Sequence, residues 1–342
     1  RGAPASINFV SCHDGFTLTD LTRYRSKHNE ANGENNNDGS SVNHSANFGV
    51  EGVTDDPDVI AAREQAAMNM IGMLLLSLGT PMMLAGDEFR NTQDGNNNAY
   101  CQDNDITWLK WDWMYSTNKT REMRRLETVS RLVALRKSLD LYHHEDFFTR
   151  LTQIGLLKPS SRVQWFLPDG TTPMERDWFD LGVRSFTMRL LSNSEVDVCI
   201  VVNGTADDRT FRLPPDTHWT PKWCSAEING RRAGHGTQVE ECDLNGDTTV
   251  WTQHVPDASE TVLKMVKEVA MQRTESSTEN EADTIKFAMP VTDHAANGTS
   301  SAPRDEVSAD MPDAPVDDTP DTPVDDNVWT MPALSITLMK QV

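Results

Sequence analysis

The sequence has few positive charges for its length of 342 residues. It holds 31 Lys and Arg residues against 52 Asp and Glu residues, so its formal net charge is −21 at pH 7. Nucleic acids and anionic membrane surfaces are bound through basic faces, so neither is expected as a partner. Residues 274–327 contain 14 acidic and two basic residues and so contribute −12, which leaves −9 for the rest of the chain. A neutral partner fits this balance best.

Cysteine is scarce as well, with five residues and no Cys-x-x-Cys pair. This pattern excludes a zinc ribbon and a disulfide scaffold, and a metal or redox protein would need better ligand spacing. A calcium loop aligned from Asp94 would have Ala99 where the sharp turn needs Gly, and Asp105 where a bidentate Glu belongs. We therefore expect no metal and no cofactor. The cysteine pattern fits reduced thiols, which favours the cytoplasm, with a plastid as the alternative.

Long hydrophobic runs are missing apart from one stretch. Residues 68–85 carry no charge, and their length just reaches that of a membrane-spanning helix. However, Gly79-Thr80-Pro81 interrupts the stretch and Asn69 lies inside it. We interpret it as the end of a buried helix, a turn and a buried strand, and expect no membrane segment.

The first chemical signal follows a short apolar segment near the amino terminus. Residues 7–10 predict a buried strand, and His13-Asp14-Gly15 comes after it, with a glycine that allows a turn. Parallel α/β sheets, including (β/α)₈ barrels, place catalytic side chains at the carboxyl ends of their strands. His13 and Asp14 are therefore candidate catalytic residues. The alternative is that Asp14 caps the next turn and His13 is a hydrogen-bonded core residue.

A helix and a second strand are expected next. Asp55-Asp56-Pro57 supplies the carboxylate cap and first-turn proline of a helix start, and apolar residues then recur at helical spacing as far as Gly79. Residues 82–85 predict a strand that ends in Asp87-Glu88. The two strands of such a βαβ unit lie parallel, so Asp14 and Asp87-Glu88 are expected at one edge of the same sheet.

The α/β part is expected to belong to a larger barrel. Residues 120–139 predict an amphipathic helix that would cover the second strand. Parallel sheets are covered on both faces and have further strands beside them, which two strands alone cannot provide. We therefore interpret this region as the closing end of a TIM barrel.

Two polar segments rich in Asn follow the candidate strands, residues 17–56 and residues 93–108. Loops of this length inside compact domains are usually functional or disordered. Because residues 17–56 follow the carboxyl end of the candidate catalytic strand, we expect a loop that shapes a site, with disorder as the alternative. Asn96, Asn97 and Asn98 precede three tryptophans, and side-chain amides together with aromatic rings suit the hydroxyls and ring faces of a sugar. These three residues are therefore candidate substrate-binding residues. An ordinary Asn-rich turn is the alternative.

The carboxyl-terminal part has a different pattern, in which short strands alternate with turn residues from about residue 147. Many short strands at this spacing predict an antiparallel β-sandwich. The predicted strands are residues 162–167, 185–190, 196–202, 210–213, 222–225, 249–254, 261–266 and 334–339.

One acidic segment breaks this run of strands. Residues 274–327 offer too little apolar surface to offset the entropy lost on ordering, so they are expected to be a disordered insertion. The fold class is thus α/β plus all-β. The expected domains are 1–145 (end of the barrel), 146–273 (β-sandwich), 274–327 (acidic insertion) and 328–342 (final sandwich strand).

Taken together, four motifs resemble bacterial-type glycogen debranching enzymes and isoamylases, a group within the α-amylase-like glycoside hydrolases. The similarity is dense over residues 5 to about 140, thinner over the sandwich, where Asp177-Trp178-Phe179-Asp180 still fits, and absent from 274–327. The motifs are Phe9-Val10-Ser11-Cys12-His13-Asp14-Gly15-Phe16-Thr17-Leu18, Lys27-His28-Asn29-Glu30-Ala31-Asn32-Gly33-Glu34, Gly79-Thr80-Pro81-Met82-Met83-Leu84-Ala85-Gly86-Asp87-Glu88-Phe89 and Gly95-Asn96-Asn97-Asn98-Ala99-Tyr100-Cys101-Gln102-Asp103-Asn104.

The resemblance implies a retaining hydrolase that acts on α-1,6 branch points of glycogen, amylopectin or limit dextrins. It also implies that residues 7–10 and 82–86 are the seventh and eighth strands of a (β/α)₈ barrel. Asp14 would be the third catalytic carboxylate, which stabilises the transition state, and His13 would hydrogen-bond the same sugar. Asp87-Glu88 would support the site.

The sequence departs from the family in one respect. A retaining glycosidase needs a nucleophilic carboxylate and a carboxylic acid about 5–5.5 Å apart. The Gly-Phe-Arg-x-Asp stretch that carries the family's nucleophile, and the family's acid Glu, do not occur in this sequence. They are expected upstream of Arg1, so the chain is interpreted as a carboxyl-terminal fragment that is inactive alone. The alternatives are a non-catalytic glucan-binding or regulatory subunit and, among enzymes, a pullulanase or other α-amylase-type glucanase.

Overall fold

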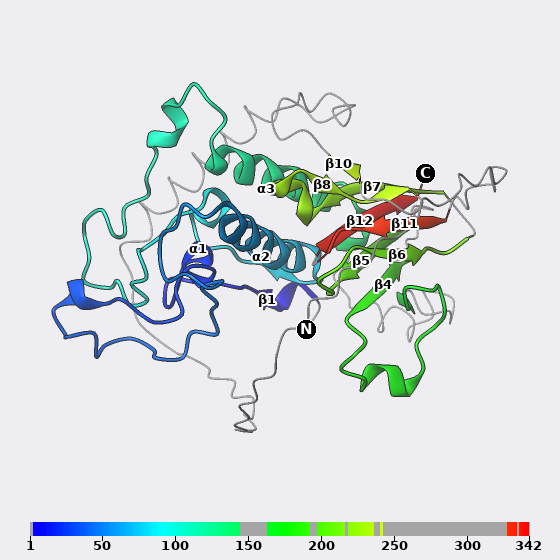
Figure 1. The fold of residues 1–342 in the computed structure, drawn as a ribbon, viewed down its shortest axis with the longest axis horizontal. Helices are drawn as coiled ribbons and strands as arrows, with labels where there is room; N and C mark the ends of the chain where they lie inside the picture. Colours follow the sequence, from blue (N-terminus) through cyan, green and yellow to red (C-terminus); the bar gives the residue numbers. More distant parts are fainter. Residues whose placement is uncertain are drawn as a thin grey trace, which may run out of the picture. The chain divides into compact units, whose positions relative to one another are not determined.

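The amino-terminal part is built around one long helix, α2 (Pro57–Leu76), which joins two short parallel strands (Figure 1). These strands are β1 (Ile7–Asn8) and β2 (Thr80–Pro81), and they pair with Ile7 opposite Thr80 and Asn8 opposite Pro81. The parallel pairing expected of a βαβ unit is therefore confirmed.

The structure is a computed structural model, and the residues it describes lie in one unit formed by residues 1–265 and 324–342. Two of the predicted strands, 249–254 and 261–266, lie outside the described residues, as do the acidic insertion up to residue 326 and the expected boundary at 145. The described residues are 3–143, 163–191, 197–215, 218–235, 240–241, 327–333 and 335–341.

Helix α2 begins where the sequence predicts. The Asp56 side chain accepts hydrogen bonds from the main-chain N–H groups of Asp58 (2.9 Å) and Val59 (3.3 Å), and Pro57 occupies the first helical position. This cap satisfies N–H groups that have no partner within the helix. The helix ends at Leu76, before the Gly79 predicted from the apolar spacing, because Ser77 is already extended.

The predicted position of the second strand was wrong by a few residues. β2 is Thr80–Pro81, whereas residues 82–85 were expected. Thr80 donates its N–H to the Ser6 carbonyl and Met82 donates to the Asn8 carbonyl, both at 2.8 Å, so the short ladder is complete at Met82. The apolar residues beyond it belong to the loop that leads to Asp87.

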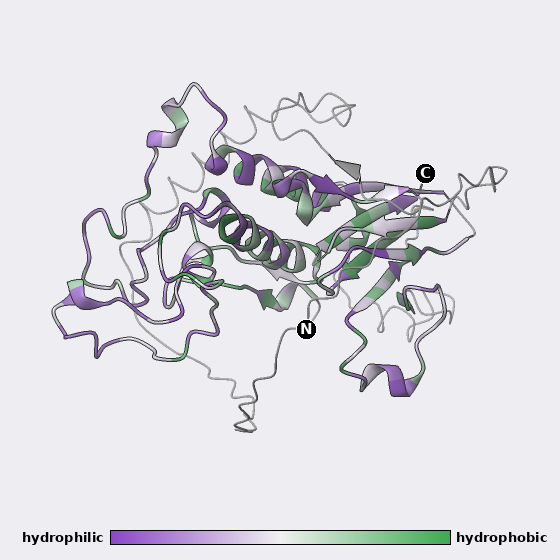
Figure 2. Cartoon of the chain, viewed as in Figure 1, coloured by the Kyte–Doolittle hydropathy of each residue, from purple (hydrophilic) through white to green (hydrophobic). Residues whose placement is uncertain are grey.

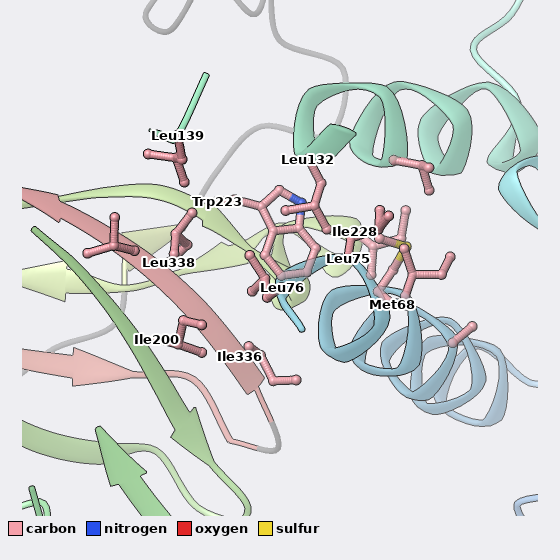
Figure 3. Packing of buried hydrophobic residues seen from close by; sticks show 14 of the residues in the cluster. Met68, Leu75, Leu76, Leu132, Leu139, Ile200, Trp223, Ile228, Ile336 and Leu338 are labelled. Atoms are coloured by element: carbon pink, nitrogen blue, oxygen red, sulfur yellow. The ribbon is translucent and has the colours of Figure 1, made fainter. Parts of the chain in front are cut away.

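Helix α3 (Arg121–Lys137) matches its prediction closely, with Thr120 as the residue that caps it. α2 and α3 contact each other, and buried side chains from both helices form one apolar cluster with the neighbouring sheet (Figure 3). By length and composition α2 could cross a membrane, but half of its apolar window is buried within the protein. We therefore describe it as a core helix. The remaining helices are α1 (Leu18–Leu21) and the 3-10 turns Ala3–Ala5, Glu30–Asn32, Asp87–Phe89, Asp112–Tyr115, Asp140–Tyr142, Glu175–Trp178 and Ser225–Asn229.

The carboxyl-terminal part consists of antiparallel sheets, as predicted. The largest has the strand order β3-β4-β5-β12-β7, and a second has the order β6-β11-β9. β8 and β10 form a separate antiparallel pair. The strands are β3 (Val163–Phe166), β4 (Ser185–Leu190), β5 (Val198–Asn203), β6 (Arg209–Arg212), β7 (Trp219–Cys224), β8 (Arg231–Arg232), β9 (Gly234–His235), β10 (Glu240–Glu241), β11 (Val328–Met331) and β12 (Ser335–Gln341).

The carboxyl terminus holds two strands where one was expected. β11 and β12 lie in different sheets, and Pro332 comes between them. A proline has no N–H to give to a sheet ladder, which makes it a natural end for a strand. β12 confirms the predicted strand 334–339, whereas β11, in the same span 328–342, was not predicted.

The five-stranded sheet is buried on both faces, as the alternation along β5 makes clear. Val198 and Ile200 belong to the cluster shared with α2 and α3, whereas Cys199 and Val201 belong to a second cluster shared with the three-stranded sheet. Successive side chains of a strand point to opposite faces, so one strand contributes to two cores. Trp223 of β7 lies at the centre of the first cluster (Figure 3).

Candidate active site

His13 and Asp14 lie on the turn that follows β1. Gly15 adopts φ +91°, a conformation that residues with a side chain rarely take, and this lets the chain reverse after Asp14. The side chains of His13 and Asp14 are 87% and 82% exposed, and His13 Nε2 lies 3.5 Å from Asp14 Oδ2. Thr17, not Asp14, caps the following helix α1. The reading of His13 as a core residue and Asp14 as a cap is therefore excluded.

The turn from Ser11 to Leu18 is anchored to the loop that follows β2. Both Ser11 Oγ and the main-chain N–H of Leu18 (2.9 Å) donate to the carboxylate of Asp87. Thr17 Oγ1 donates to the Asn91 carbonyl at 3.0 Å, and the Gly15 N–H donates to a carbonyl of the same loop at 3.0 Å. The candidate catalytic pair and Asp87 therefore lie at the same edge of the parallel strands, as predicted.

The asparagine loops are held together by hydrogen bonds of asparagine side chains. Asn29 Nδ2 donates to Asn97 Oδ1 at 2.9 Å, and the main-chain N–H of Asn97 donates to Asn29 Oδ1 at 3.0 Å. Asn97 Nδ2 donates in turn to the Ser40 carbonyl at 2.8 Å and to Asn43 Oδ1 at 2.6 Å. Gly39 packs so closely that a Cβ there would lie 2.7 Å from Asn29 Nδ2.

A second set of contacts surrounds Asp38. Its Oδ2 accepts hydrogen bonds from Asn32 Nδ2 at 2.7 Å and from Asn98 Nδ2 at 2.9 Å. These hydrogen bonds from Asn32 and Asn98 hold the pKa of the Asp38 carboxyl below its usual range. Asn96 Nδ2 donates to Asn32 Oδ1 at 2.8 Å, which links the same two loops again.

These contacts bear on the three asparagines proposed as sugar ligands. Asn96 and Asn97 are buried and Asn98 is half-buried, and the side-chain amides of all three donate to groups of the protein. In the structure these three side chains therefore hold in place the loop that contacts Gly15. Direct contact between Asn96, Asn97 or Asn98 and a sugar stays a prediction.

Asp87 is the buried carboxylate of this region, at 2% exposure. Burial raises the pKa of Asp87 to about 6, although the hydrogen bonds from Ser11 and Leu18 oppose the rise. Asp20 is also buried, and burial raises the pKa of its carboxyl too; it accepts from the side chain of Thr92 and from the Gln93 N–H at 2.8 Å.

A buried ion pair lies beneath these loops, and the sequence reasoning missed it. Arg125 of α3 is 1% exposed, and its guanidinium lies 2.7 Å from Glu64 of α2. Arg90 also lies 2.7 Å from Glu64. Burial alone would raise the pKa of Glu64, but these two guanidiniums hold it below its ordinary value. The sequence could have indicated this ion pair, because the charged residues Glu64 and Arg125 fall on the apolar faces of their helices.

Exposed aromatic residues lie on the segment after Asn98. Tyr100 and Trp108 are exposed, whereas Trp111 packs on Phe89 with ring centroids 4.8 Å apart.

Among the described residues, no group of three or more His, Cys, Asp or Glu side chains is arranged to hold a metal ion.

A hollow of about 340 Å³ lies elsewhere, and neither His13 nor Asp14 lines it. Most of its lining comes from β2, α2, α3 and the segment after α3. The lining residues are Leu75, Pro81, Met83, Val133, Arg136, Lys137, Tyr142 and His143.

Curated relatives are similar to this chain over half of its length or more. A protein of Mycobacterium tuberculosis (strain H37Rv) described as a glycogen operon protein GlgX homolog is 44% identical over 189 residues, which are 54% of this chain and 25% of the relative. A glycogen debranching enzyme of Pectobacterium atrosepticum is 38% identical over 242 residues, 70% of this chain and 34% of the relative. The chain thus spans between a quarter and a third of the length of these relatives. A comparison with models of known protein families finds no match.

Solved structures give weaker similarities. A pullulanase of Anoxybacillus sp. LM18-11 complexed with maltotetraose matches with a TM-score of 0.41 and 17% identity, over 70% of this chain and 26% of that chain. The catalytic module of the pneumococcal virulence factor SpuA, described as glycogen-degrading, matches with a TM-score of 0.47 and 13% identity, over 99% and 36%. The resemblance to glycogen debranching enzymes, first inferred from motifs, is confirmed by the curated relatives.

Proposed function

We propose, from its homology with glycogen debranching enzymes, that this chain is the carboxyl-terminal part of a hydrolase that cleaves α-1,6 branch linkages of a glucan with retention. The observation that carries the proposal is the exposed His13-Asp14 pair after a strand of a parallel βαβ unit. Active sites of barrel enzymes occupy this edge of the sheet. Identities of 38–44% to proteins with these names support the choice of substrate.

The parallel strands are proposed to be the last two of a (β/α)₈ barrel, with the antiparallel sheets as a β-sandwich after it. Ile7 and Phe9 are 60% and 54% exposed at β1, and Met82 is 38% exposed after β2. Apolar side chains on parallel strands are ordinarily covered by neighbouring strands and helices. The length that the relatives have beyond this chain is enough to supply that cover.

Within this proposal, Asp14 does not attack the substrate. Glycoside cleavage passes through an oxocarbenium-like state, and hydrogen bonds to the sugar hydroxyls strengthen as the ring distorts. Asp14 would accept hydrogen bonds from two hydroxyls of the sugar being cleaved, and His13 would bond the same ring. The nucleophile and the general acid would come from the part of the protein that this chain does not cover.

The substrate is proposed to be a branched α-glucan such as glycogen, amylopectin or a limit dextrin. A sugar polymer without charge suits a chain with a net charge of −21. We also propose the cytoplasm as the compartment, with a plastid as the alternative, because the sequence has five cysteines and no Cys-x-x-Cys pair.

The experiment is an assay of the full-length protein that contains this chain, with a branched limit dextrin and a linear maltooligosaccharide as substrates. We expect linear chains to be released from the branched substrate only. The first product should be the α-anomer when NMR follows the reaction, because retention requires it. Cleavage of the linear substrate would favour another α-amylase-type glucanase.

Two other results would contradict the proposal. Binding of glycogen without release of chains would identify a glucan-binding subunit instead. A native protein of only 38.3 kDa, the mass of the 342 residues, would remove the part assigned to the nucleophile and the acid.

A further inference from the structure

Asp87 contacts both ends of the turn that carries His13 and Asp14. Its Oδ1 accepts from the Leu18 N–H at 2.9 Å, and its Oδ2 accepts from Ser11 Oγ. Ser11 and Leu18 enclose the residues that bear the candidate catalytic side chains. One rigid carboxylate therefore fixes where the turn begins and where it ends.

A substitution of Asp87 can also remove two of the hydrogen bonds that hold this turn. Four hydrogen bonds join residues 11–18 to residues 87–97, and Asp87 accepts two of them with its side chain. The other two are accepted by the main-chain carbonyls of Asn91 and Asn97, which no substitution removes. His13 and Asp14 themselves are largely exposed.

We propose that Asp87 is a positioning residue, whose carboxylate holds the turn from Ser11 to Leu18 so that Asp14 faces the sugar. This inference rests on the proposed function for the role of Asp14, although the contacts themselves do not. Hydrogen bonds constrain both distance and direction, and His13 and Asp14 are too exposed for apolar packing to fix their direction.

The burial of Asp87 supports this role. Burial removes water from the Asp87 carboxylate and so disfavours its charged form. The two hydrogen bonds offset this cost only in part, so the pKa of Asp87 is raised to about 6. A group retained at a cost to stability is typical of a functional region.

The test compares Asp87→Ala with Asp87→Asn in the full-length protein. An asparagine side chain can accept from the Leu18 N–H with its oxygen and donate to Ser11 Oγ with its nitrogen, so it should keep the turn in place. Alanine can do neither. We expect Asp87→Ala to lower kcat by about 10–100-fold with little change in KM, because a small displacement of a catalytic group is that costly. Asp87→Asn should restore most of kcat at neutral pH.

Hydrogen–deuterium exchange supplies a measurement that does not depend on activity. In Asp87→Ala, amides of the turn, with Leu18 first, should exchange about tenfold faster, because one main-chain hydrogen bond is lost. Amides within α2 should stay unchanged. The matched control is Asp197→Ala, which removes a buried carboxylate 2.6 Å from Arg189 in the five-stranded sheet. It should loosen β4 and β5 and leave both the turn and kcat unaltered.

The inference is overturned if Asp87→Ala leaves exchange in the turn unchanged, or if Asp87→Asn is as slow as Asp87→Ala. A uniform rise in exchange across α2 and the sheets would also overturn it, because Asp87 would then have only a general structural role. If the wild-type protein releases no chains while the turn still loosens in Asp87→Ala, the proposed function fails and the contact between Asp87 and the turn stands.

Discussion

The loop region, residues 9–56 and 82–118, and the sheet region, β3 to β12, are held together by different forces. Figure 2 shows that the loop region is largely hydrophilic, whereas strands of the sheet region carry many hydrophobic residues. The loop region depends on side-chain hydrogen bonds such as those of Asn97 and Asp87. The sheet region depends on two apolar clusters, with Trp223 and Leu338 at less than 2% exposure in the first.

The two regions therefore differ in what they contribute, one to stability and the other to the orientation of the candidate site. Apolar burial stabilises roughly in proportion to the area removed from water and has little directional preference. Hydrogen bonds contribute less each, but they fix the direction of the groups that they join. The sheet region with α2 and α3 therefore supplies most of the stability, and the loop region orients His13 and Asp14.

The largest effect on stability is expected from Trp223→Ala. The indole fills the space between α2 and the sheet, where a Cβ on Gly72 would lie only 2.8 Å from it. Its removal should lower the free energy of unfolding by about 3–5 kcal/mol, the usual cost of emptying a core site. Leu181→Ala, at a 90% exposed position, is the control and should change it by no more than about 0.5 kcal/mol. Urea unfolding measures both, and equal midpoints would contradict the account of the core.

The buried ion pair beneath the loops comes next. Arg125→Met should lower the free energy of unfolding by about 3 kcal/mol, because it leaves the Glu64 carboxylate buried with less compensation. The double variant Arg125→Met with Glu64→Leu should recover part of this loss, since it leaves no buried charge at Glu64, while Arg90 loses that partner and keeps Glu122 at 3.1 Å. A double variant that is no more stable than Arg125→Met alone would show that the charges are not the cause.

The free energy of unfolding should depend on pH through the ionisation of Asp87. Its pKa is raised from 3.8 to about 6 in the folded protein, so its favourable contribution is complete below pH 3.8 and is lost as the pH rises through 6. The lost stability is about 3 kcal/mol, at about 1.4 kcal/mol for each pKa unit. Arg125 favours the ionised form and Asp20 opposes it.

Asp87→Asn should remove this dependence. The wild-type free energy of unfolding, relative to that of Asp87→Asn, should therefore fall between pH 4 and pH 7. Chemical unfolding across that range measures the difference. A constant difference would mean that Asp87 titrates alike in the folded and unfolded states.

The smallest effect on stability is expected at two glycines. Gly15 and Gly49 adopt φ +91° and +92°, and no atom lies within 4 Å of an added Cβ at either position. Alanine should therefore cost about 1–2 kcal/mol at each, through backbone strain alone. Only Gly15→Ala should also reduce kcat, because only Gly15 lies beside Asp14. Equal kcat of Gly15→Ala and Gly49→Ala would show that the conformation of the turn at Gly15 does not affect catalysis.

The sequence predicted the features that depend on neighbouring residues. Asp56 with Pro57 marked the start of α2, because a helix cap is a local structure, and the amphipathic spacing over 120–139 predicted α3. The antiparallel sheets followed from short apolar segments between turns. The place of β2 was missed, since the pairing partner and not the hydrophobicity of residues 82–85 determines where a two-residue strand forms.

The candidate site was predictable only in part. His13 and Asp14 were found because they follow a strand, and a strand end is visible in the sequence. The two hydrogen bonds between Asn29 and Asn97 were not foreseen, because the residues are 68 positions apart and each belongs to a loop without periodicity. Residues of one type can bind a sugar or each other, and only their contacts distinguish the two.

The central claim is that the carboxylate of Asp14 acts on a glucose ring, and the most direct measurement is kcat/KM of Asp14→Asn on a branched limit dextrin. Asp14→Asn in the full-length protein should lower this constant by roughly 10²–10³-fold, as removal of a group that stabilises developing charge does. Because the side chain is exposed, the unfolding midpoint should stay at the wild-type value. A value of kcat/KM within threefold of the wild type, with the same midpoint, would contradict the role given to Asp14.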